Sequence, residues 1–177
     1  MIPSRLFVPN VEGLEWLWKK FNENRHLFDD SLVATPIEMA CWLAARDTAS
    51  FTLGASETDP DGIVIFAGIM PGFGAIAHIF IWNPEPHHPR DLIRTLRVIA
   101  LTVMKANDLH RLTLITPIRK PEARILANRV GFKTEGRLVE AVKEDGQWAD
   151  AWLLGLLPRY VQEAEEHDTL KSGEKEG

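Results

Sequence analysis

Two apolar runs joined by a short turn most constrain the fold of this chain. Residues 63–70 (IVIFAGIM) and 75–82 (AIAHIFIW) are rich in β-forming residues, and 71–74 (PGFG) supplies turn residues between them. The pattern predicts a β-hairpin. Successive side chains of a strand point to opposite faces, so runs that are apolar throughout must be covered on both sides. We therefore expect this hairpin in the middle of a sheet with helices on both faces.

A long amphipathic segment follows the hairpin. Pro89 opens a predicted helix that runs to about Asn107, and its apolar residues recur every three or four positions. The apolar stripe consists of Leu92, Leu96, Ile99, Val103 and Ala106, widened by Ile93, Ala100 and Met104. Residues 111–116 (RLTLIT) then predict a strand. A strand, a helical crossover and a second strand form a right-handed unit, so strands 75–82 and 111–116 are expected to be parallel.

The remaining elements complete an α/β domain. The other predicted elements are a strand at 5–8, helices at 11–22 and 36–46, a strand at 50–55, a helix from Pro121 to Gly131, and a hairpin of 132–142 and 148–157. Thr35 and Glu38 form a capping box at the start of the second helix. We expect one domain over residues 1–160, with a mixed sheet of about six to seven strands and helices on both faces.

The acidity of the chain is concentrated at its C-terminal end. The net charge is −5, and residues 161–177 carry −4 of it, which leaves −1 for residues 1–160. A nearly neutral domain has no field that would attract nucleic acid, so no nucleic-acid partner is expected. The acidic segment 161–177 lacks aromatic residues and is expected to be a disordered tail.

Nothing in the sequence predicts a membrane or a metal site. The N-terminus lacks a basic segment followed by an apolar run, and no stretch approaches the roughly 18 apolar residues of a spanning helix. A cytoplasmic protein is therefore expected. The single cysteine, Cys41, excludes an internal disulfide and a cysteine-based zinc site, and its apolar surroundings predict a place in the core.

The C-terminal half resembles the GNAT N-acetyltransferases. The residues that carry the resemblance are EARILANRVGFKTEGRL at 122–138 and DGQWADAWLLGLL at 145–157. In that family a short helix ends in a Gly-Phe pair, a Glu-Gly step leads into a strand, and a closing strand carries an acid near its start. The matching residues here are Gly131, Phe132, Glu135, Gly136 and Asp150. The resemblance implies the GNAT fold, and it is nearest to the branch that acetylates protein N-termini or small amines.

The resemblance implies an N-acyltransferase that moves an acetyl group from acetyl-CoA to a primary amine by direct attack in a ternary complex. The acceptor would be a small molecule or a protein N-terminus, bound near the two N-terminal helices. In the family, the pantetheine arm pairs with the strand end before the phosphate loop, which here implies Ile81, Trp82 and Asn83. A helix N-terminus binds anions, so the helix opened by Pro89 is expected to face the CoA diphosphate.

The phosphate loop departs from the family pattern Arg/Gln-x-x-Gly-x-Gly/Ala. The residues that align with it, and that we expect to bind the cofactor, are His88, Arg90, Asp91, Leu92 and Ile93. Asp91 and Ile93 stand where the family has glycine or alanine. A carboxylate at 91 would repel a diphosphate, although the dipole of the helix alone also favours an acid in its first turn. His87 and His88 either contact phosphate or belong to a solvated loop, and no third ligand nearby indicates a metal.

His78 is the expected general base. It interrupts an apolar strand close to where the family often carries a glutamate, and histidine has a pKa suited to taking a proton from an ammonium. The alternative is a core histidine bonded to the backbone. Glu38 and Glu57 are weaker candidates. The tyrosine that protonates the leaving thiolate in many relatives is replaced by Ala127, and the only tyrosine, Tyr160, lies past the last strand.

Two functions from different classes therefore stay open. The first is the acyl-CoA-dependent enzyme, in which an exposed tryptophan among Trp16, Trp18 and Trp42 would line the acceptor pocket. The second is a catalytically degenerate GNAT-fold binding or structural protein of the kind that bacteriophages encode, which the altered loop and the missing tyrosine favour. The β-type last strand (AWLLGLL) would also allow a homodimer through strand pairing.

Overall fold

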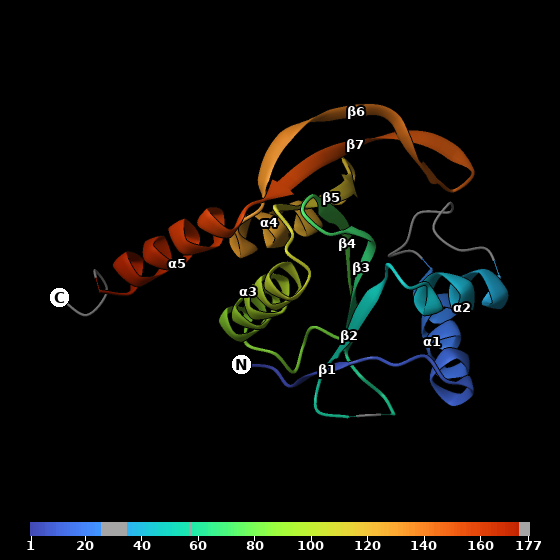
Figure 1. The fold of residues 1–177 in the computed structure, drawn as a ribbon. Helices are drawn as coiled ribbons and strands as arrows, with labels where there is room; N and C mark the ends of the chain where they lie inside the picture. Colours follow the sequence, from blue (N-terminus) through green and yellow to red (C-terminus); the bar gives the residue numbers. More distant parts are fainter. Residues whose placement is uncertain (26–34, 57, 174–177) are drawn as a thin grey trace.

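The computed structural model describes residues 1–25, 35–56 and 58–173, which fold around a mixed seven-stranded sheet (Figure 1). The strands are β1 (Ser4–Leu6), β2 (Ala49–Leu53), β3 (Gly62–Met70), β4 (Gly74–Ile81), β5 (Arg111–Pro117), β6 (Lys133–Glu144) and β7 (Gln147–Leu156). The helices are α1 (Val11–Glu23), α2 (Pro36–Ala44), α3 (Pro89–Ala106), α4 (Pro121–Val130) and α5 (Pro158–Gly173). The strand order is β1-β2-β3-β4-β5-β7-β6, so the predicted fold class is confirmed.

The predicted hairpin and the predicted crossover lie at the centre of the sheet. β3 pairs antiparallel with β4, and β4 pairs parallel with β5. One apolar cluster joins α3 and α4 to one face of these strands, and a second cluster joins α1 and α2 to the other face. Figure 1 shows the two helix pairs on opposite sides of the sheet. Cover on both faces explains why these strands are apolar at successive positions.

The helices begin where their capping residues predict. In α2 the Thr35 hydroxyl accepts from the Glu38 amide at 3.2 Å, and the Glu38 carboxylate accepts from the Thr35 amide at 3.0 Å. In α3 the predicted stripe is buried from Leu92 to Val103 and Met104, but Ala106 is exposed because the last turn lies at the surface. None of the helices in the described part of the chain is both long and apolar enough to cross a membrane.

The acidic C-terminal segment is helical as far as Gly173 rather than disordered as predicted, and the last four residues lie outside the described ranges. α5 runs from Pro158 to Gly173, and Val161 is fully buried in the main apolar cluster. Arg97, a buried residue of α3, donates to Asp168 at 2.8 Å and to the carbonyl oxygens of Arg129 and Val130. A buried cation is stabilised by such partners, so the ion pair and the buried valine anchor the segment to the domain.

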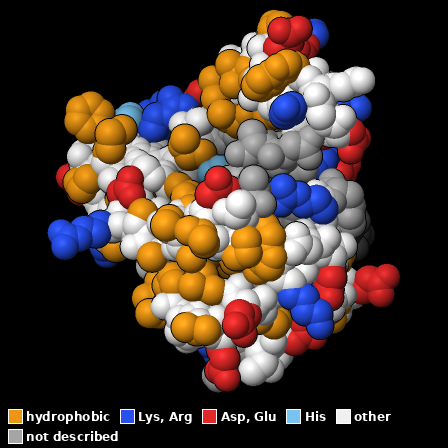
Figure 2. Space-filling model, turned by 90° about the vertical axis from the view of Figure 1, so that its right-hand side faces the viewer, with side chains coloured by type: hydrophobic (Ala, Val, Ile, Leu, Met, Phe, Trp, Pro, Cys, Tyr) orange, Lys and Arg blue, Asp and Glu red, His pale blue; other side chains and the backbone are white. Residues whose placement is uncertain are grey.

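The prediction for Cys41 is also wrong, because Cys41 is exposed. It lies between Met39 and Leu43, which are the buried residues of α2, and these two set the inward face of the helix. Figure 2 looks onto the side of the molecule that carries α1 and α2 and shows hydrophobic side chains gathered over that side. The exposed apolar residues of these helices include Val11 and Ile37.

The last strand lies inside the sheet and cannot form the dimer edge that its sequence suggested. β7 is flanked by β5 and β6, so its backbone groups are already paired. The edge strand on this side of the sheet is β6. Leu138 pairs with Ala151 and Val142 with Ala149, so residues 139–141 form a bulge opposite Asp150 alone. A bulged edge that carries charged side chains resists pairing with a second sheet.

Candidate cofactor and acyl-transfer site

The two central parallel strands part toward their carboxyl ends. β4 pairs with β5 only from Gly74 to Ile76, opposite Arg111 to Thr113. Beyond this point β4 continues to Ile81 with β3 as its partner, and β5 continues to Pro117 with β7 as its partner. The described strands therefore open into a wedge at the end of a parallel pair where α/β proteins bind ligands.

The direction of the backbone groups decides which residues face the wedge. The amides of Trp82 and Asn83 both donate to the Asp61 carbonyl at 3.1 Å, so they point toward β3. Backbone groups alternate between the two edges of a strand, so those of Ile79 and Ile81 point toward β5. Of the three predicted pantetheine partners, only Ile81 faces the wedge. The sequence prediction missed Ile79, which the same alternation would have found.

Asp61, which the sequence analysis did not single out, holds the loop after β4 close to the start of β3 through side-chain hydrogen bonds. Its Oδ1 accepts from Asn83 Nδ2 at 2.8 Å, and its Oδ2 lies 2.9 Å from His87 Nε2. The Asp61 and His87 side chains are only 17% and 12% exposed. A shielded contact between a carboxylate and an imidazole, with an additional hydrogen bond from Asn83, fixes the loop geometry. In the sequence Asp61 stands between Pro60 and Gly62, and no motif there marks it as a site residue.

The first turn of α3 has fewer open amides than a helix start usually offers. Pro89 has no amide hydrogen, and the Arg90 amide donates to Nδ1 of His88, the N-cap, at 3.3 Å. The amides of Asp91 and Leu92 donate to the His88 carbonyl at 2.9 and 3.2 Å. The turn thus satisfies its own donors, which weakens the anion site that a helix N-terminus otherwise supplies.

The side chains of the predicted phosphate loop divide into two groups. Those of Leu92 and Ile93 are buried in the apolar core, at 8% and 7% exposure, so only their backbones are available to a ligand. Those of His88 and Arg90 are exposed. With the half-exposed Asp91, the structure therefore brings three polar side chains, rather than five contact residues, to the loop surface.

Asp91 is paired with the ammonium group of Met1, whose nitrogen lies 3.0 Å from Oδ1. The hydrogen bond and charge of this ammonium, with smaller contributions from His88 and Arg94, lower the pKa of Asp91. The next residue is fixed as well, because the Ile2 amide donates to the Thr95 hydroxyl at 2.8 Å, and that hydroxyl donates to the Ile2 carbonyl at 3.2 Å. Figure 1 shows this end of the chain beside α3.

His78 lies on the other face of β4, toward α1 and α2. Its ring meets Trp42 edge to face at a centroid distance of 5.1 Å and stacks on Phe80 at 6.2 Å. Trp16 and Trp82 meet at 5.8 Å in the same cluster, and the Trp16 indole nitrogen is buried without a hydrogen-bond partner among the described residues. His78 is half-buried. The structure thus groups aromatic side chains around the predicted base.

The other acid–base candidates do not meet at the wedge. Glu38 is engaged in the capping box of α2, and Glu57 lies outside the described residues. Ala127, at the place of the family tyrosine, is buried. Tyr160 lies at the start of α5, with Lys133 Nζ 3.9 Å from its ring centroid. Within the described ranges, no group of three or more His, Cys, Asp or Glu side chains is arranged to hold a metal ion.

The residues that carried the family resemblance have structural roles. Gly131 ends α4 with a φ of 122°, which disfavours any side chain there. Glu135 pairs with Arg111 at 2.7 Å. Asp150 accepts the Glu140 amide of the β6 bulge at 2.8 Å and pairs with Arg137. These two contacts, the amide first, lower the pKa of Asp150.

Comparison with known proteins supports the fold at low sequence identity. No protein-family model matches the sequence, and no curated protein matches it either. Among solved structures, spermidine N-acetyltransferase SpeG from Vibrio cholerae, in complex with CoA and spermine, superposes with a TM-score of 0.72 at 18% identity. That match covers 90% of this chain and 98% of the other. A point mutant of the same enzyme matches with a TM-score of 0.72 at 18% identity, covering 92% and 98%. With its seven-stranded sheet and these superpositions, the chain has the GNAT fold.

Proposed function

We propose that this protein is an N-acyltransferase that transfers an acetyl group from acetyl-CoA to a primary amine by direct attack in a ternary complex. The observation that carries the proposal is the wedge, because a parallel strand pair that opens toward the start of α3 leaves backbone groups for an extended ligand. The superposed spermidine N-acetyltransferase holds CoA and spermine, which supports an acyl-CoA donor and an amine acceptor.

The chain offers a strand edge to the pantetheine arm. An extended ligand that joins a strand edge is held by main-chain hydrogen bonds, and here these would come from Ile79 and Ile81. The exposed His88 and Arg90 side chains would meet the phosphates. Acetyl-CoA supplies the activated thioester, and the residues of the chain bind and orient it beside the amine.

His78 is the group that would remove a proton from the acceptor ammonium. The neutral amine then attacks the thioester carbonyl carbon, the carbon–sulfur bond breaks, and the thiolate leaves and takes up the proton that the attacking nitrogen releases as the amide forms. The contacts with Trp42 and Phe80 fix the plane of the imidazole, which favours proton transfer in one direction. Because His78 faces α1 and α2, the amine would enter from that side of the sheet.

Thermal unfolding with acetyl-CoA tests the proposal directly. A ligand that binds only the folded state raises its free energy of unfolding, by about 2.7 kcal/mol at a hundred times the dissociation constant. We expect acetyl-CoA to raise the melting temperature and desulfo-CoA to do so as well, while adenosine has little effect. An unchanged melting temperature at millimolar acetyl-CoA would remove the donor from the proposal and with it the enzyme.

Replacing His78 tests the role of the base. We expect His78→Gln to lower kcat for amine acetylation by about a hundredfold, the usual lower range for a lost general base, without changing the dissociation constant of acetyl-CoA. His110→Gln, an exposed histidine at the far end of β5, is the matched control. Unaltered turnover in His78→Gln would show that the histidine is only a packing residue.

A second function, a GNAT-fold binding or structural protein without CoA chemistry, is favoured by one observation. The donors of the first α3 turn are satisfied within the turn, and a carboxylate stands beside them. Such a protein would ignore acetyl-CoA in the thermal experiment and acetylate none of a panel of amines. A cytoplasmic location and a homodimer remain predictions of the sequence for either function.

A further inference from the structure

Two side chains stand on opposite lips of the wedge and on the same face of the sheet. Ile76 of β4 pairs with Thr113 of β5, in the last pair before the strands part. Paired residues of neighbouring strands point to the same face, and so do the residues two positions further along each strand. His78 and Ile115 therefore face the same side, one on each lip. An acceptor that reaches the wedge beside His78 must also lie next to Ile115.

The neighbouring strands extend this pair into a row of four side chains. His78 pairs with Ile65 of β3, which is fully buried in the apolar cluster of α1 and α2, and Ile115 pairs with Leu153 of β7. The row therefore lies on the side of the molecule that Figure 2 shows. The two helices cover only its β3 end, because the described members of their cluster include no residue of β5 or β7. At the other end Ile115 is 40% exposed and Leu153 is half-buried.

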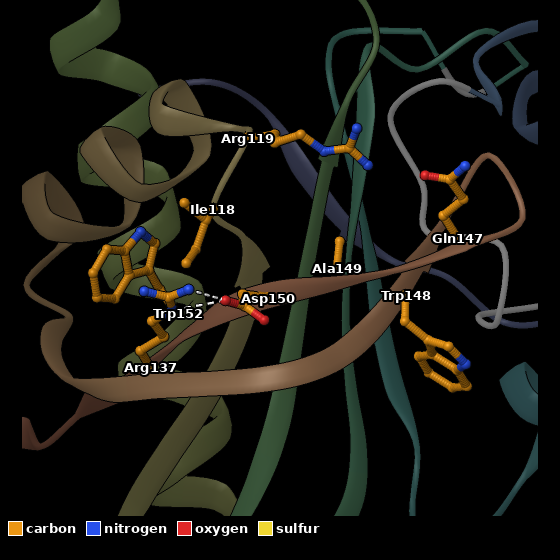
Figure 3. A pocket seen from close by; sticks show the side chains of 8 residues that line it. All are labelled: Ile118, Arg119, Arg137, Gln147, Trp148, Ala149, Asp150 and Trp152. Atoms are coloured by element: carbon orange, nitrogen blue, oxygen red, sulfur yellow. Dashed lines mark hydrogen bonds and ion pairs between the residues drawn. The ribbon is translucent and has the colours of Figure 1, made fainter.

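The charged side chains near the wedge end of β7 belong to the other face of the sheet. Successive residues of a strand alternate between faces, so Asp150 and Trp152 point away from the side on which Leu153 lies. In Figure 3 the ion pair of Arg137 and Asp150 lies beside Trp152. Trp152 packs toward α4, where the Arg124 guanidinium carbon lies 4.9 Å from its ring centroid. This ion pair therefore does not belong to the row of His78 and Leu153.

Two charges that border the row on its own face neutralise each other. Arg111 lies four residues before Ile115 and so on the same face of β5, and its Nη2 lies 2.7 Å from Glu135 Oε2. The pair crosses over Gly155, where an added Cβ would lie 2.7 Å from Arg111 Nη2. Gly155 is two residues from Leu153 on β7. An acceptor that lies on Ile115 and Leu153 therefore borders a closed ion pair rather than a free carboxylate.

The side chains that cover His78 are aromatic. Trp42 of α2 meets the imidazole edge to face at 5.1 Å, and Phe80, the next residue of β4 on this face, stacks on it at 6.2 Å. Glu38 lies one helical turn before Trp42, but its carboxylate accepts the Thr35 amide in the capping box. Among the described residues, the surroundings of His78 on this face are thus aromatic on α2 and β4 and aliphatic on β5.

We propose that the acceptor is a primary amine on an apolar body, such as an aralkylamine, with its nitrogen at His78 and its body against Ile115 and Leu153. This inference rests on the proposed function, because it names the acceptor of that reaction. Burial of an apolar body against these side chains favours binding. A polyamine would instead bring further ammonium groups onto an apolar lip, where they lose hydration without gaining a carboxylate among the described residues. The acceptor class therefore differs from the spermine that the superposed enzyme holds.

Calorimetric titration of the full chain with phenethylamine, ethylamine and spermidine, without CoA and with millimolar desulfo-CoA, tests the apolar lip. We expect phenethylamine to bind about tenfold more tightly than either of the other two. Ile115→Asn and the milder Ile115→Ala should each weaken phenethylamine by about fivefold, while Ile125→Asn, at an exposed isoleucine of α4 on the opposite face, leaves it unchanged. Thermal unfolding checks that each variant is folded. Spermidine binding as tight as that of phenethylamine, or unchanged binding in both Ile115 variants, would overturn the proposal.

Steady-state acetylation separates this proposal from the proposed function. A kcat/KM about tenfold higher for phenethylamine than for spermidine supports both. Turnover that prefers spermidine overturns the acceptor class and keeps the enzyme. Phenethylamine binding in a chain that acetyl-CoA does not stabilise supports the apolar amine site and rejects the enzyme. A tetrapeptide that begins with phenylalanine, if it is acetylated more efficiently than phenethylamine, supports the same apolar lip with a peptide N-terminus as the source of the amine.

Discussion

The loops that follow the two central parallel strands differ in how they are held. After β4, residues 82–88 are tied to β3 through the carboxylate and carbonyl of Asp61, and the helix that follows is capped by the side chain of His88. After β5, residues 118–120 lead into α4, whose N-cap, Lys120, makes no side-chain capping bond. Arg119 in this loop reaches across to Glu144 and stays largely exposed.

The difference shows that a side chain, here that of Asp61, can fix a loop at a position where the family pattern has glycine. Where the GNAT family pattern has a glycine-rich loop before this helix, this chain has a carboxylate, Asp61, that holds the shielded His87 ring and the exposed Asn83 amide and so fixes the loop. In the loop after β5 the Ile118 and Lys120 amides are bonded to Asp150 and Pro117, and Arg119 keeps a largely exposed side chain.

Removing the Asp61 carboxylate should have the largest effect on the loop after β4. Asp61→Ala leaves the shielded His87 ring without its partner, a loss that costs about 1–3 kcal/mol for a buried group, and it also removes the exposed hydrogen bond to Asn83. We expect the free energy of unfolding in urea to fall by about 3 kcal/mol. The matched control is Asp59→Ala, since Asp59 is 67% exposed in its pair with Lys20 and should cost below about 1 kcal/mol. Equal effects at the two positions would show that the loop is held by its backbone alone.

A side chain at Gly62 should have the next largest effect. A Cβ placed there would lie 2.5 Å from the backbone oxygen of Phe80, so β3 and β4 would have to move apart just where Ile81 faces the wedge. Overpacking of this kind costs about 1–3 kcal/mol, and we expect Gly62→Ala to lose about 2 kcal/mol by urea unfolding. Gly136→Ala, where the added Cβ meets nothing within 4 Å, is the control. A fully stable Gly62→Ala would mean that the end of β4 adjusts freely.

Much of the architecture could be predicted because local signals and global packing agreed. The hairpin, the parallel crossover and the capping box of Thr35 and Glu38 each follow from residue type and spacing, and all are confirmed. The C-terminal helix could not be predicted from composition. Its docking depends on Val161 in the core and on Asp168 next to Arg97, contacts between residues far apart in the sequence.

The site was predictable only in part, for a similar reason. Position along the strand suggested Ile81, Trp82 and Asn83 together, and their role stays a prediction, but the orientation of the Trp82 and Asn83 amides depends on the Asp61 carbonyl, which precedes another strand. The partner of Asp91 is the Met1 ammonium, and no local pattern brings these two groups together.

Replacing Asp91 should change CoA binding by a smaller amount. Asp91→Gly removes a negative charge beside the expected diphosphate and frees the Met1 ammonium, and both changes favour an anion. We expect acetyl-CoA to bind about fivefold more tightly, the factor that one screened charge at contact distance implies. Asp108→Gly, at the far end of α3 with a φ of 51° that glycine tolerates, is the control. Weaker binding in Asp91→Gly would show that the carboxylate organises the loop rather than repelling the ligand.

The smallest expected effect concerns Asp150 and pH. The Glu140 amide and Arg137 lower the pKa of Asp150 in the folded chain, so the folded state favours the ionised carboxylate more than the unfolded chain does. A lowered pKa contributes stability above the ordinary value of about 3.9, and this contribution is lost as the pH falls through the folded pKa. Asp150→Asn should therefore be less stable than the wild type at pH 7, with the difference shrinking below about pH 4.

Urea unfolding of the two chains between about pH 3 and pH 7 measures this effect on the β5 side of the molecule. Asp145→Asn, an exposed residue of the β6–β7 turn, should show no such pH-dependent difference. The contrary result is a difference in the free energy of unfolding between Asp150→Asn and wild type that is as large at about pH 3 as at about pH 7. That result would mean that Asp150 holds the β6 bulge without its charge, because a protonated acid still accepts the Glu140 amide.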